Sequence, residues 1–292
     1  MKNNMVKIGL ALVLVISLMG CGNLDVGGSG AASTLEKAKE EGKIKVGFAN
    51  EKPYAYRDAN GKVTGEAVEI SKAIFKKMGI KEVEPVLTEF GQLIPGLKAK
   101  RFDVITAGMY ITPERCKEVA FADPEYQIGE ALAVKKGNPK DLHSYEDVVK
   151  NEDVKVGVMQ GAIEIQYMED LGVKKSQIKQ YSDQPGVVQA LKSGRVDAIT
   201  MTGPSLTEIL KAQGQEGIDV VKDFEQPVID GKSVVGFGAA GFRPEDKEFR
   251  DQFTQELNKM EESGELLKIL KEFNFGDENL PGDKTQEELC KG

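Results

Sequence analysis

The chain has 292 residues, of which 40% are apolar, and its formal net charge is −8 at pH 7. An acidic surface repels the phosphates of nucleic acids, so this charge argues against a nucleic-acid-binding protein. The length is sufficient for two modest hydrophobic cores.

The first 20 residues have the pattern of an export signal. Two lysines precede an apolar run over residues 8–18, and Cys21 follows shortly after it. This run is too short for a membrane-spanning helix, which needs about 20 apolar residues. The sequence Leu18-Met19-Gly20-Cys21 resembles a bacterial lipobox, which implies cleavage after residue 20 and lipidation of Cys21. Cleavage would remove two lysines and no acids, and the formal charge would change from −8 to −10.

Residues 21–33 are rich in glycine, serine and alanine and have little apolar surface to bury. Such a composition is typical of a flexible tether. We therefore expect an exported protein whose folded body begins at residue 34 and which a lipid anchor holds on the outer face of the cell membrane.

Strands and helices alternate through the first part of the folded body. Short apolar runs predict strands, and apolar residues at helical spacing predict helices. Alternation of this kind is typical of a mainly parallel sheet with helices on both faces. The predicted elements, in chain order, are strand Ile44–Ala49, helix Glu66–Met78, strand Val83–Thr88, helix Phe90–Lys100 and strand Asp103–Ala107.

A short helix is predicted directly after the last of these strands. Thr112 is a good N-cap residue, and Pro113 suits the first helical position. Arg115 then lies in the first turn, where unpaired backbone N–H groups and the helix dipole favour an anion. A planar guanidinium can hold a carboxylate through two parallel, charge-assisted hydrogen bonds. The alternative interpretation is a surface ion pair between Arg115 and the acidic residue at position 114, 118 or 123.

The same alternation starts again near residue 154 and predicts a second lobe of the α/β class. It again joins short apolar runs to amphipathic helices. The predicted elements are strand Val154–Val158, helix Ala162–Leu171, strand Ile178–Tyr181, helix Val187–Lys192 and strand Ala198–Thr202.

Two segments are expected to connect the lobes. The extended stretch Ile128–Lys136 is long enough to leave one sheet and enter the next, and a return is expected near Gln226–Gly236. The chain then continues as a strand, Val234–Phe242, and as a long helical pattern, Pro244–Phe273. Two crossings would form a hinge. The expected organisation is lobe 1 from residues 34–132 and 235–285, lobe 2 from residues 133–234, and a C-terminal tail of residues 286–292.

Two cysteines, Cys116 and Cys290, are left once Cys21 is lipidated. An exported protein lives where a disulfide can persist. A bond between the two would hold the C-terminal tail beside the Arg115 helix. Two unpaired thiols are equally compatible with the sequence, so the pairing stays open here.

Several motifs occur in the order found in one protein family. The chain resembles the family 3 extracellular solute-binding proteins, the polar amino acid class of bacterial ABC importers, over residues 43–275. The resemblance implies a type II periplasmic-binding-protein fold, in which two α/β lobes close on a small solute and deliver it to the transmembrane subunits of an ABC permease. It implies a monomeric binding protein, with no enzymatic activity, cofactor or metal. The motifs are FGQLIPGLKAKRFD (90–103), AGMYITPER (107–115), FADP (121–124), VGVMQG (156–161) and ALKSGRVDA (190–198).

The family pattern assigns roles to the two motifs that face each other across the cleft. It makes Arg115 the clamp for the carboxylate of the ligand. It also implies that the turn at Gly161 and Ala162 offers backbone N–H groups from the facing lobe. Gly161 suits a turn that a ligand approaches closely, because it has no side chain.

The chain departs from the usual amino acid pattern at three positions. Thr202 stands where an Asp commonly binds the α-amino group of the ligand. Glu51 replaces a stacking aromatic residue in the first loop, and Tyr110 replaces a small hydroxyl residue. A primary ammonium group therefore loses its usual partner.

These departures resemble the ectoine- and hydroxyectoine-binding branch of the family, whose ligand is a cyclic amidinium carboxylate. In that branch Glu51 would bind the ring N–H groups, the aromatic residues would enclose the ring through cation–π contacts, and Arg115 would hold the carboxylate. A linear polar amino acid, such as glutamine or arginine, is the alternative zwitterionic ligand. The matching set is Glu51, Tyr54, Phe90, Tyr110 and Arg115.

Several of these residues also have a plainer interpretation. In the plainer interpretation Tyr54 and Phe90 are core residues between the lobes, because aromatic side chains are mostly buried for packing. Glu51 would pair in solvent with the basic residue at position 52 or 57. In the second lobe Glu164 would either contact the ligand or complement a helix dipole, and we favour the dipole. For Thr202 we favour a neutral wall of the pocket over a specific contact.

Two other classes of protein share this fold, namely cyclohexadienyl dehydratase-like enzymes and the sensory domains of receptors and channels. Proton chemistry would need a cleft acid, and burial of Glu51 among aromatic rings would raise its pKa. The only histidine, His143, lies outside every matched motif, and we expect it on the surface. No Ser/His/Asp set or metal-ligand cluster is recognisable. No second apolar segment follows Phe275, so a membrane-bound sensor is not expected.

Overall fold

The structure, a computed structural model, describes residues 32–291. From Ser33 onward the chain forms one compact unit. The expected signal peptide (1–20), Cys21 and the expected tether up to residue 31 lie outside the described residues. Ser33, the last residue of that tether, is instead the N-cap of helix α1 (Thr34–Glu41): its hydroxyl accepts from the N–H of Glu36, whose carboxylate accepts from the N–H of Ser33.

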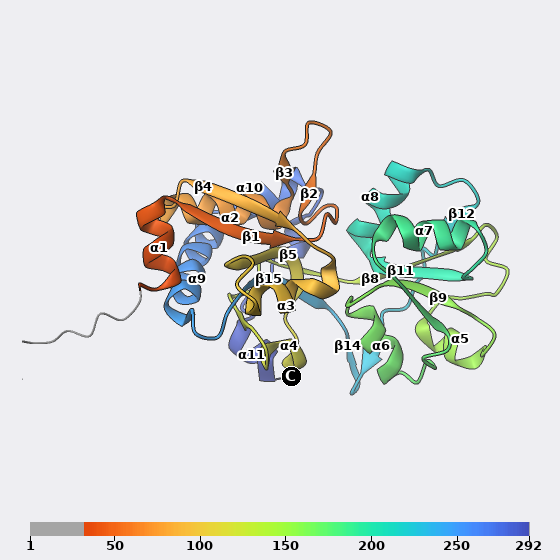
Figure 1. Ribbon diagram of the computed structural model, residues 1–292. Helices are drawn as coiled ribbons and strands as arrows, with labels where there is room; N and C mark the ends of the chain where they lie inside the picture. Colours follow the sequence, from red (N-terminus) through yellow and green to blue (C-terminus); the bar gives the residue numbers. More distant parts are fainter. Residues whose placement is uncertain (1–31, 292) are drawn as a thin grey trace, which may run out of the picture. The chain divides into compact units, whose positions relative to one another are not determined.

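The expected two lobes of the α/β class are confirmed, and each is built on its own sheet (Figure 1). In the first sheet β1 (Lys43–Phe48) is parallel to both of its neighbours, whereas β15 returns antiparallel from the far end of the chain. The strand order is β4 (Glu82–Leu87), β1, β5 (Val104–Tyr110), β15 (Gly236–Phe242) and β6 (Ala120–Phe121), with β7 (Tyr126–Ile128) also paired to β15.

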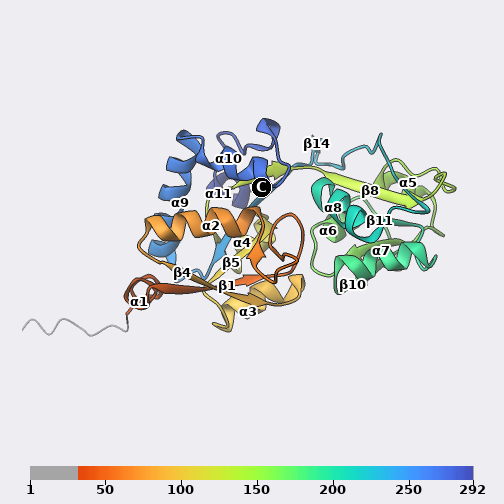
Figure 2. The same cartoon turned by 90° about the horizontal axis from the view of Figure 1, so that it is seen from above.

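Helices from both ends of the chain cover this first sheet (Figures 1 and 2). Phe75, Phe242, Phe249 and Phe253 form a cluster of tilted and edge-on ring contacts with centroids 5.2–6.0 Å apart. The elements are α2 (Glu66–Lys77), the 3-10 helix η1 (Phe90–Gln92), α3 (Leu93–Lys98), α9 (Lys247–Glu262) and α10 (Glu265–Glu272), with a small hairpin of β2 (Tyr56–Arg57) and β3 (Val63–Thr64) beside them.

The second sheet is parallel over three strands and then antiparallel at β8. Its strand order is β10 (Ile178–Tyr181), β9 (Val156–Met159), β11 (Ala198–Thr202), β8 (Glu130–Lys135) and β12 (Ile218–Val220). Its helices are α5 (Tyr145–Lys150), α6 (Glu164–Asp170), α7 (Gln184–Lys192) and α8 (Gly203–Gln213).

The chain crosses between the sheets at Gly129 and again between β12 and β15. The two crossing segments are tied together, because the side chain of Gln226 accepts from the N–H of Glu130 and donates to its carbonyl, both at 2.8 Å. The second crossing carries a two-stranded hairpin, β13 (Val228–Ile229) and β14 (Lys232–Ser233). The expected boundary after residue 132 is three residues late, since β8 pairs within the second sheet from Glu130.

The long helical pattern expected over residues 244–273 forms two helices. Gly264, with a φ of +75°, separates α9 from α10. Glycine adopts this left-handed conformation without strain, so it breaks the helix while the apolar spacing continues across the break. Leu257, Leu266 and Leu270 are all buried in the same core.

The C-terminal segment is a helix and not an unstructured tail. Helix α11 (Gln286–Lys291) follows the 3-10 helix η2 (Asp277–Asn279), and Cys290 on it forms a disulfide with Cys116. The two Cα atoms are 5.7 Å apart. The end of the chain is therefore attached to the segment that carries Arg115.

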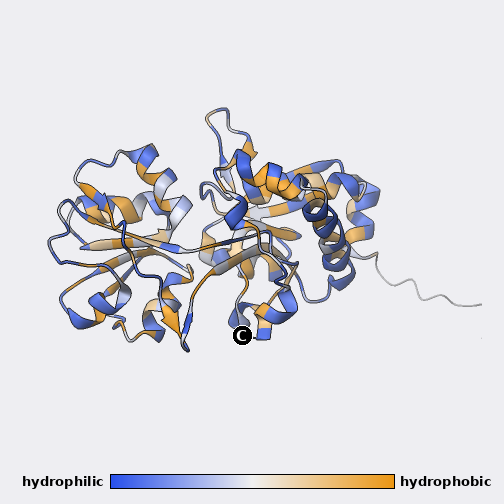
Figure 3. Cartoon of the chain, turned by 180° about the vertical axis from the view of Figure 1, so that it is seen from behind, coloured by the Kyte–Doolittle hydropathy of each residue, from blue (hydrophilic) through white to orange (hydrophobic). Residues whose placement is uncertain are grey.

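Figure 3 shows that the strands are largely apolar, whereas the loops and the outer side of α9 are mostly hydrophilic. Every residue of β5 is buried, as expected for a central strand covered on both faces. Within residues 32–291 no helix is both long enough and apolar enough to cross a membrane.

Candidate functional site

Arg115 lies on α4 (Pro113–Cys116), at the end of the central strand β5. The Thr112 hydroxyl accepts from the N–H of Arg115 at 3.2 Å, and Pro113 occupies the first helical position. This is the local structure that the sequence predicts, with Thr112 as N-cap. The strand and the cap together fix the base of the arginine side chain.

The guanidinium of Arg115 connects the two lobes. Its Nη1 donates to the carbonyl of Tyr110 at 2.8 Å, and its Nη2 donates to the carbonyl of Gly161 at 3.0 Å. The guanidinium carbon lies 5.7 Å from the centre of the Phe90 ring. Among the described residues no acidic side chain forms an ion pair with Arg115, and Glu118 pairs instead with Lys98. The surface ion-pair interpretation is therefore wrong.

A cavity opens beside Arg115, with walls from both lobes. Most of the residues singled out in the sequence line it, and Gly161 contributes the carbonyl that binds Arg115 at its edge. The lining residues are Glu51, Tyr54, Phe90, Gly108, Tyr110, Arg115, Met159, Ala162, Ile163, Glu164, Gln184, Thr200, Met201 and Thr202.

Glu51 is a buried carboxyl in this cavity, with 7% of its surface exposed. Its Oε1 accepts from the Gln184 side chain at 2.7 Å and from the Ser205 hydroxyl at 3.1 Å, both in the second lobe. Burial, followed by the negative charge of Glu164, raises the pKa of Glu51 to about 8, although these two hydrogen bonds oppose the shift. The expectation of a raised pKa is confirmed, and pairing in solvent with residue 52 or 57 is not observed.

Tyr54 combines the two roles that the sequence left open. It lines the cavity and is also a core residue, because its ring stacks on Tyr126 with centroids 5.4 Å apart. Its hydroxyl forms a hydrogen bond of 2.6 Å with the Thr202 hydroxyl. Thr202 is therefore more than the expected neutral wall, since it makes a specific contact between the lobes.

Gly161 has no room for a side chain. Its φ is +80°, and a Cβ built on it would lie 2.7 Å from the Cα of Gly91 in the first lobe. The close neighbour in this structure is thus the backbone of the other lobe. A glycine at this position lets the lobes approach each other beside Arg115.

The cavity contains more acid than the sequence suggested. Glu164, for which a helix-dipole role was favoured over ligand contact, is 3% exposed and lines the cavity. Burial raises its pKa, and burial and the charge of Glu164 raise the pKa of the neighbouring Glu130. Burial also lowers the pKa of Arg115. Arg115 thus shares a largely buried cavity with two carboxyl groups, Glu51 and Glu164, and Glu130 lies next to the second of them.

The residues that the sequence did not single out lie at the first turns of second-lobe helices or within strands. Gln184 follows the N-cap Asp183 of α7, and Ser205 lies in the first turn of α8. The predicted start of α7 at Val187 was three residues late, so Gln184 fell outside it. The Asp183 N-cap followed by Pro185 was the signal for the earlier start.

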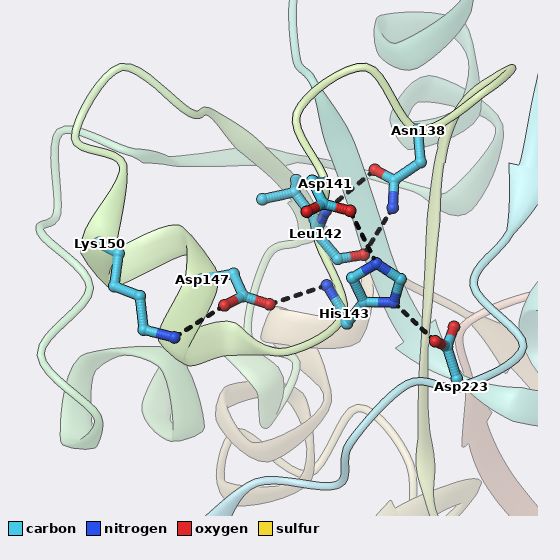
Figure 4. Close-up of polar contacts among 7 residues, drawn as sticks. All are labelled: Asn138, Asp141, Leu142, His143, Asp147, Lys150 and Asp223. Atoms are coloured by element: carbon cyan, nitrogen blue, oxygen red, sulfur yellow. Dashed lines mark hydrogen bonds and ion pairs between the residues drawn. The ribbon is translucent and has the colours of Figure 1, made fainter.

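His143 lies outside this cavity, on the loop between β8 and α5 (Figure 4). Its Nε2 lies 3.1 Å from Asp141 Oδ1, and its Nδ1 lies 2.9 Å from Asp223 Oδ2. Hydrogen bonds to these two carboxylates raise its pKa. Within the described part of the chain no cluster of three or more His, Cys, Asp or Glu side chains could hold a metal ion.

The chain matches the family model of bacterial extracellular solute-binding proteins, family 3, over residues 44–277. A probable amino-acid ABC transporter periplasmic-binding protein, y4tE of Sinorhizobium fredii, is 36% identical over 263 residues, which are 89% of this chain and 86% of that protein.

Two solved structures are also similar. The structure of EhuB in complex with hydroxyectoine has a TM-score of 0.80 and 35% identity, covering 88% of this chain and 97% of that one. The ancestral amino acid-binding protein AncCDT-1, a precursor of cyclohexadienyl dehydratase, has a TM-score of 0.71 and 30% identity, covering 82% and 99%. The chain therefore belongs to the family 3 bacterial extracellular solute-binding proteins, and it is a solute-binding protein of ABC transport with the type II periplasmic-binding-protein fold.

Proposed function

We propose that this protein captures a small zwitterion in the cavity between its lobes, with ectoine or hydroxyectoine as the favoured ligand. Arg115 would hold the carboxylate, Glu51 would bind the cationic N–H groups, and Tyr54, Phe90 and Tyr110 would enclose the ring between them. The backbone N–H of Gly161 would complete the carboxylate site, whereas that of Ala162, which the sequence also suggested, donates to the carbonyl of Met159 at 3.1 Å in this structure. The observation that carries the proposal is that one cavity, walled by both lobes, is lined by Arg115, Glu51 and the three aromatic residues.

The chemistry of these residues supports a delocalised cation. Aromatic faces attract a cation by about 2 kcal/mol or more when water is excluded. An ionised Glu51 is costly in this buried site, and a bound cation would offset that cost. The similarity to EhuB, whose structure contains hydroxyectoine, points the same way.

We propose that Cys21 carries a lipid anchor and that the mature protein acts as a monomer on the outer face of the membrane, where it passes its ligand to an ABC permease. The two lobes and the two crossings between them would then form a clamp. A ligand that contacts both lobes would stabilise the closed state of this clamp.

Isothermal titration of the purified protein with ectoine, hydroxyectoine and the common amino acids tests the ligand. Binding of ectoine or hydroxyectoine more tightly than any amino acid is the expected result. Tighter binding of a linear amino acid would support the alternative, a polar amino acid as ligand. The similarity to y4tE and AncCDT-1 also supports this alternative. Binding of none of them would contradict the proposal.

A second candidate is an enzyme on the same fold. The observation that favours it is the raised pKa of Glu51 in a cavity lined by aromatic residues, because a cleft acid with a pKa of about 8 suits proton transfer near neutral pH. Incubation of the purified protein with prephenate and arogenate distinguishes the enzyme from the solute receptor. Turnover would support the enzyme, whereas stoichiometric ectoine binding with no product would support the receptor.

A further inference from the structure

His143 is the only histidine of the chain, and each of its ring nitrogens faces a carboxylate. Its Nε2 lies 3.1 Å from Oδ1 of Asp141, in the same loop, and its Nδ1 lies 2.9 Å from Oδ2 of Asp223, where the second crossing begins (Figure 4). An ionised carboxylate can only accept a hydrogen bond, and a neutral imidazole has a single N–H to donate. Only the imidazolium, with a proton on each nitrogen, therefore satisfies both contacts at once.

The other charged groups at this loop do not take the place of the imidazolium. Asp147 accepts from the backbone N–H of His143 at 3.0 Å and pairs with Lys150, whose Nζ lies 2.9 Å from Oδ1 of that carboxylate (Figure 4). Within residues 32–291 neither Asp141 nor Asp223 pairs with a lysine or an arginine. The charge that joins the two aspartates is thus the one that His143 carries.

The segment that begins the second crossing rests on the loop of His143. The N–H of Glu225 donates to the His143 carbonyl at 2.8 Å. Beside it the ring of Phe224 packs edge-on against Tyr145, with centroids 5.3 Å apart. The Tyr145 hydroxyl is hydrogen-bonded to the hydroxyl of Thr200, which lines the cavity. A change at His143 therefore acts on the hinge and reaches the cavity wall through two aromatic side chains.

The ion pairs of His143 are open to solvent. The imidazole is 37% exposed, whereas the side chains of Asp141 and Asp223 are 95% and 73% exposed. Water and salt screen such pairs, so each contributes little to the stability of the whole protein. We therefore expect their effect on the segment that they hold directly. The two carboxylates raise the pKa of the imidazole, so the contacts are complete at low pH and are lost as the pH rises through that pKa.

We propose that the His143 imidazolium is a pH-sensitive pin, which fixes the start of the second crossing to the second lobe by bridging Asp141 and Asp223. Loss of one proton leaves a single N–H for two carboxylates, and the crossing segment loosens. The hinge is therefore held more firmly at low pH than at high pH. This pin does not depend on which ligand the cavity binds, so it goes beyond the proposed function and is tested separately from it.

NMR spectroscopy of the isotope-labelled protein, made without a histidine tag, tests the pin at both ends. The signals of the one imidazole give its pKa, and the hydrogen exchange of the Glu225 amide shows how firmly the crossing is held on the His143 carbonyl. We expect the protection of this amide, corrected for the intrinsic pH dependence of exchange, to fall about two- to five-fold as the ring loses its proton. The Val221 amide, bonded to the carbonyl of Leu132 at 2.9 Å, should keep its protection.

Variants identify the imidazolium as the cause. His143→Gln should have the low protection of the Glu225 amide at every pH, and His143→Arg, which keeps its charge, should show no fall with pH. Asp223→Asn should lower both the pKa of the imidazole and the protection at low pH. The control is Asp153→Asn, because Asp153 is an exposed aspartate of the same lobe for which the described residues offer no ion pair. This change should alter neither quantity.

Constant protection of the Glu225 amide while the ring titrates, or a fall that His143→Gln retains, would overturn the pin. An imidazole pKa near the ordinary value of about 6.5 that Asp223→Asn leaves unchanged would also overturn it. None of these results bears on the binding of a zwitterion between the lobes.

Discussion

At the scale of single residues, the account depends on Arg115. Its guanidinium is fixed by a helix cap at its base and by two carbonyls at its tip, one from each side of the cavity. In the free protein the two carbonyls accept hydrogen bonds from the Arg115 guanidinium. The carboxylate of a ligand would bind this guanidinium more strongly than the carbonyls do. Capture of a ligand would then exchange neutral acceptors for a charged one.

Replacement of Arg115 by Ala should weaken the binding of a carboxylated ligand at least about 100-fold, because two charge-assisted hydrogen bonds are worth about 3 kcal/mol or more together. Isothermal titration measures the loss. Arg101→Ala is the matched control, since Arg101 is exposed and outside the cavity. An equal effect of both changes would argue against a clamp.

Replacement of Gly161 by Ala should hinder closure of the lobes. A Cβ would lie 2.7 Å from the backbone of Gly91, and the φ of +80° adds strain of about 1–2 kcal/mol. Gly137→Ala is the control, because its φ is +81° and no atom lies within 4 Å of the built Cβ. We expect only Gly161→Ala to reduce the ligand-induced compaction measured by small-angle X-ray scattering. Equal compaction in both variants would contradict this role.

Residue-level reasoning from the sequence succeeds where the signal is local. The N-cap at Thr112 and the proline after it are adjacent to Arg115, so the placement of the arginine could be predicted. The acids of the second lobe could not. Glu130 begins a strand and Glu164 a helix of the same lobe, and only tertiary packing brings Glu164 into the cavity lining with Glu130 beside it, which propensities and spacing do not encode.

At the scale of elements, the disulfide joins α4 to α11 across 174 residues of sequence. Closing a loop of this size lowers the conformational entropy of the unfolded chain, which stabilises the fold by roughly 5 kcal/mol in the chain-entropy model. Sequence showed that two cysteines were available in an oxidising compartment, but not that α11 returns to the first lobe. The bond therefore supports the helix that carries Arg115.

Loss of this disulfide in Cys290→Ser should lower the free energy of unfolding by about 2–4 kcal/mol, measured in denaturant. Addition of a reductant to the wild-type protein should reproduce the change and have no further effect on the variant. A variant as stable as the wild type under oxidising conditions would show that the bond contributes nothing.

Element boundaries show the same limit of sequence reasoning. Strands β10 and β11 begin and end where the sequence predicts, because apolar runs bounded by polar residues are local signals. The helical pattern over residues 244–273 is helical in the structure, but the pattern did not show the break at Gly264, because the apolar spacing continues across this residue while the helix does not. Glycine alone in a helical pattern does not reveal whether the helix ends there.

At the scale of the whole molecule, five buried carboxyl groups among residues 32–291 have pKa values raised chiefly by burial: Glu51, Glu66, Glu125, Glu130 and Glu164. Glu66 and Glu125 lie in the first lobe, outside the cavity lining, and their oxygens have no partner within the described residues. An acid with a raised pKa binds its proton more tightly in the folded state than in the unfolded chain. Folding is therefore coupled to protonation.

The free energy of unfolding should fall as the pH rises from about 5 to about 8. Over this range the unfolded carboxyls lose their protons first, while the folded protein keeps them. Glu51 alone, with a folded pKa of about 8, lowers stability by on the order of 1 kcal/mol per pH unit. His143 changes stability in the same direction, because its raised pKa stabilises the fold at low pH and this contribution is lost as the pH rises through that pKa.

Denaturant unfolding of the ligand-free protein at a series of pH values tests this coupling. Glu51→Gln should reduce the slope, because Glu51 has a pKa of about 8 in the folded protein and the glutamine cannot ionise. Glu169→Gln, on the surface, should retain the wild-type slope. Stability that is constant or rises between pH 5 and pH 8 would contradict the burial of these acids.

A crystal structure of the protein with the tightest-binding of ectoine, hydroxyectoine and arginine is the most direct test of the clamp. The account predicts a ligand between the lobes, with its carboxylate within hydrogen-bond distance of the Arg115 guanidinium and its cationic group against Glu51. A ligand bound elsewhere, or an Arg115 side chain that faces bulk solvent while the ligand is bound, would contradict it.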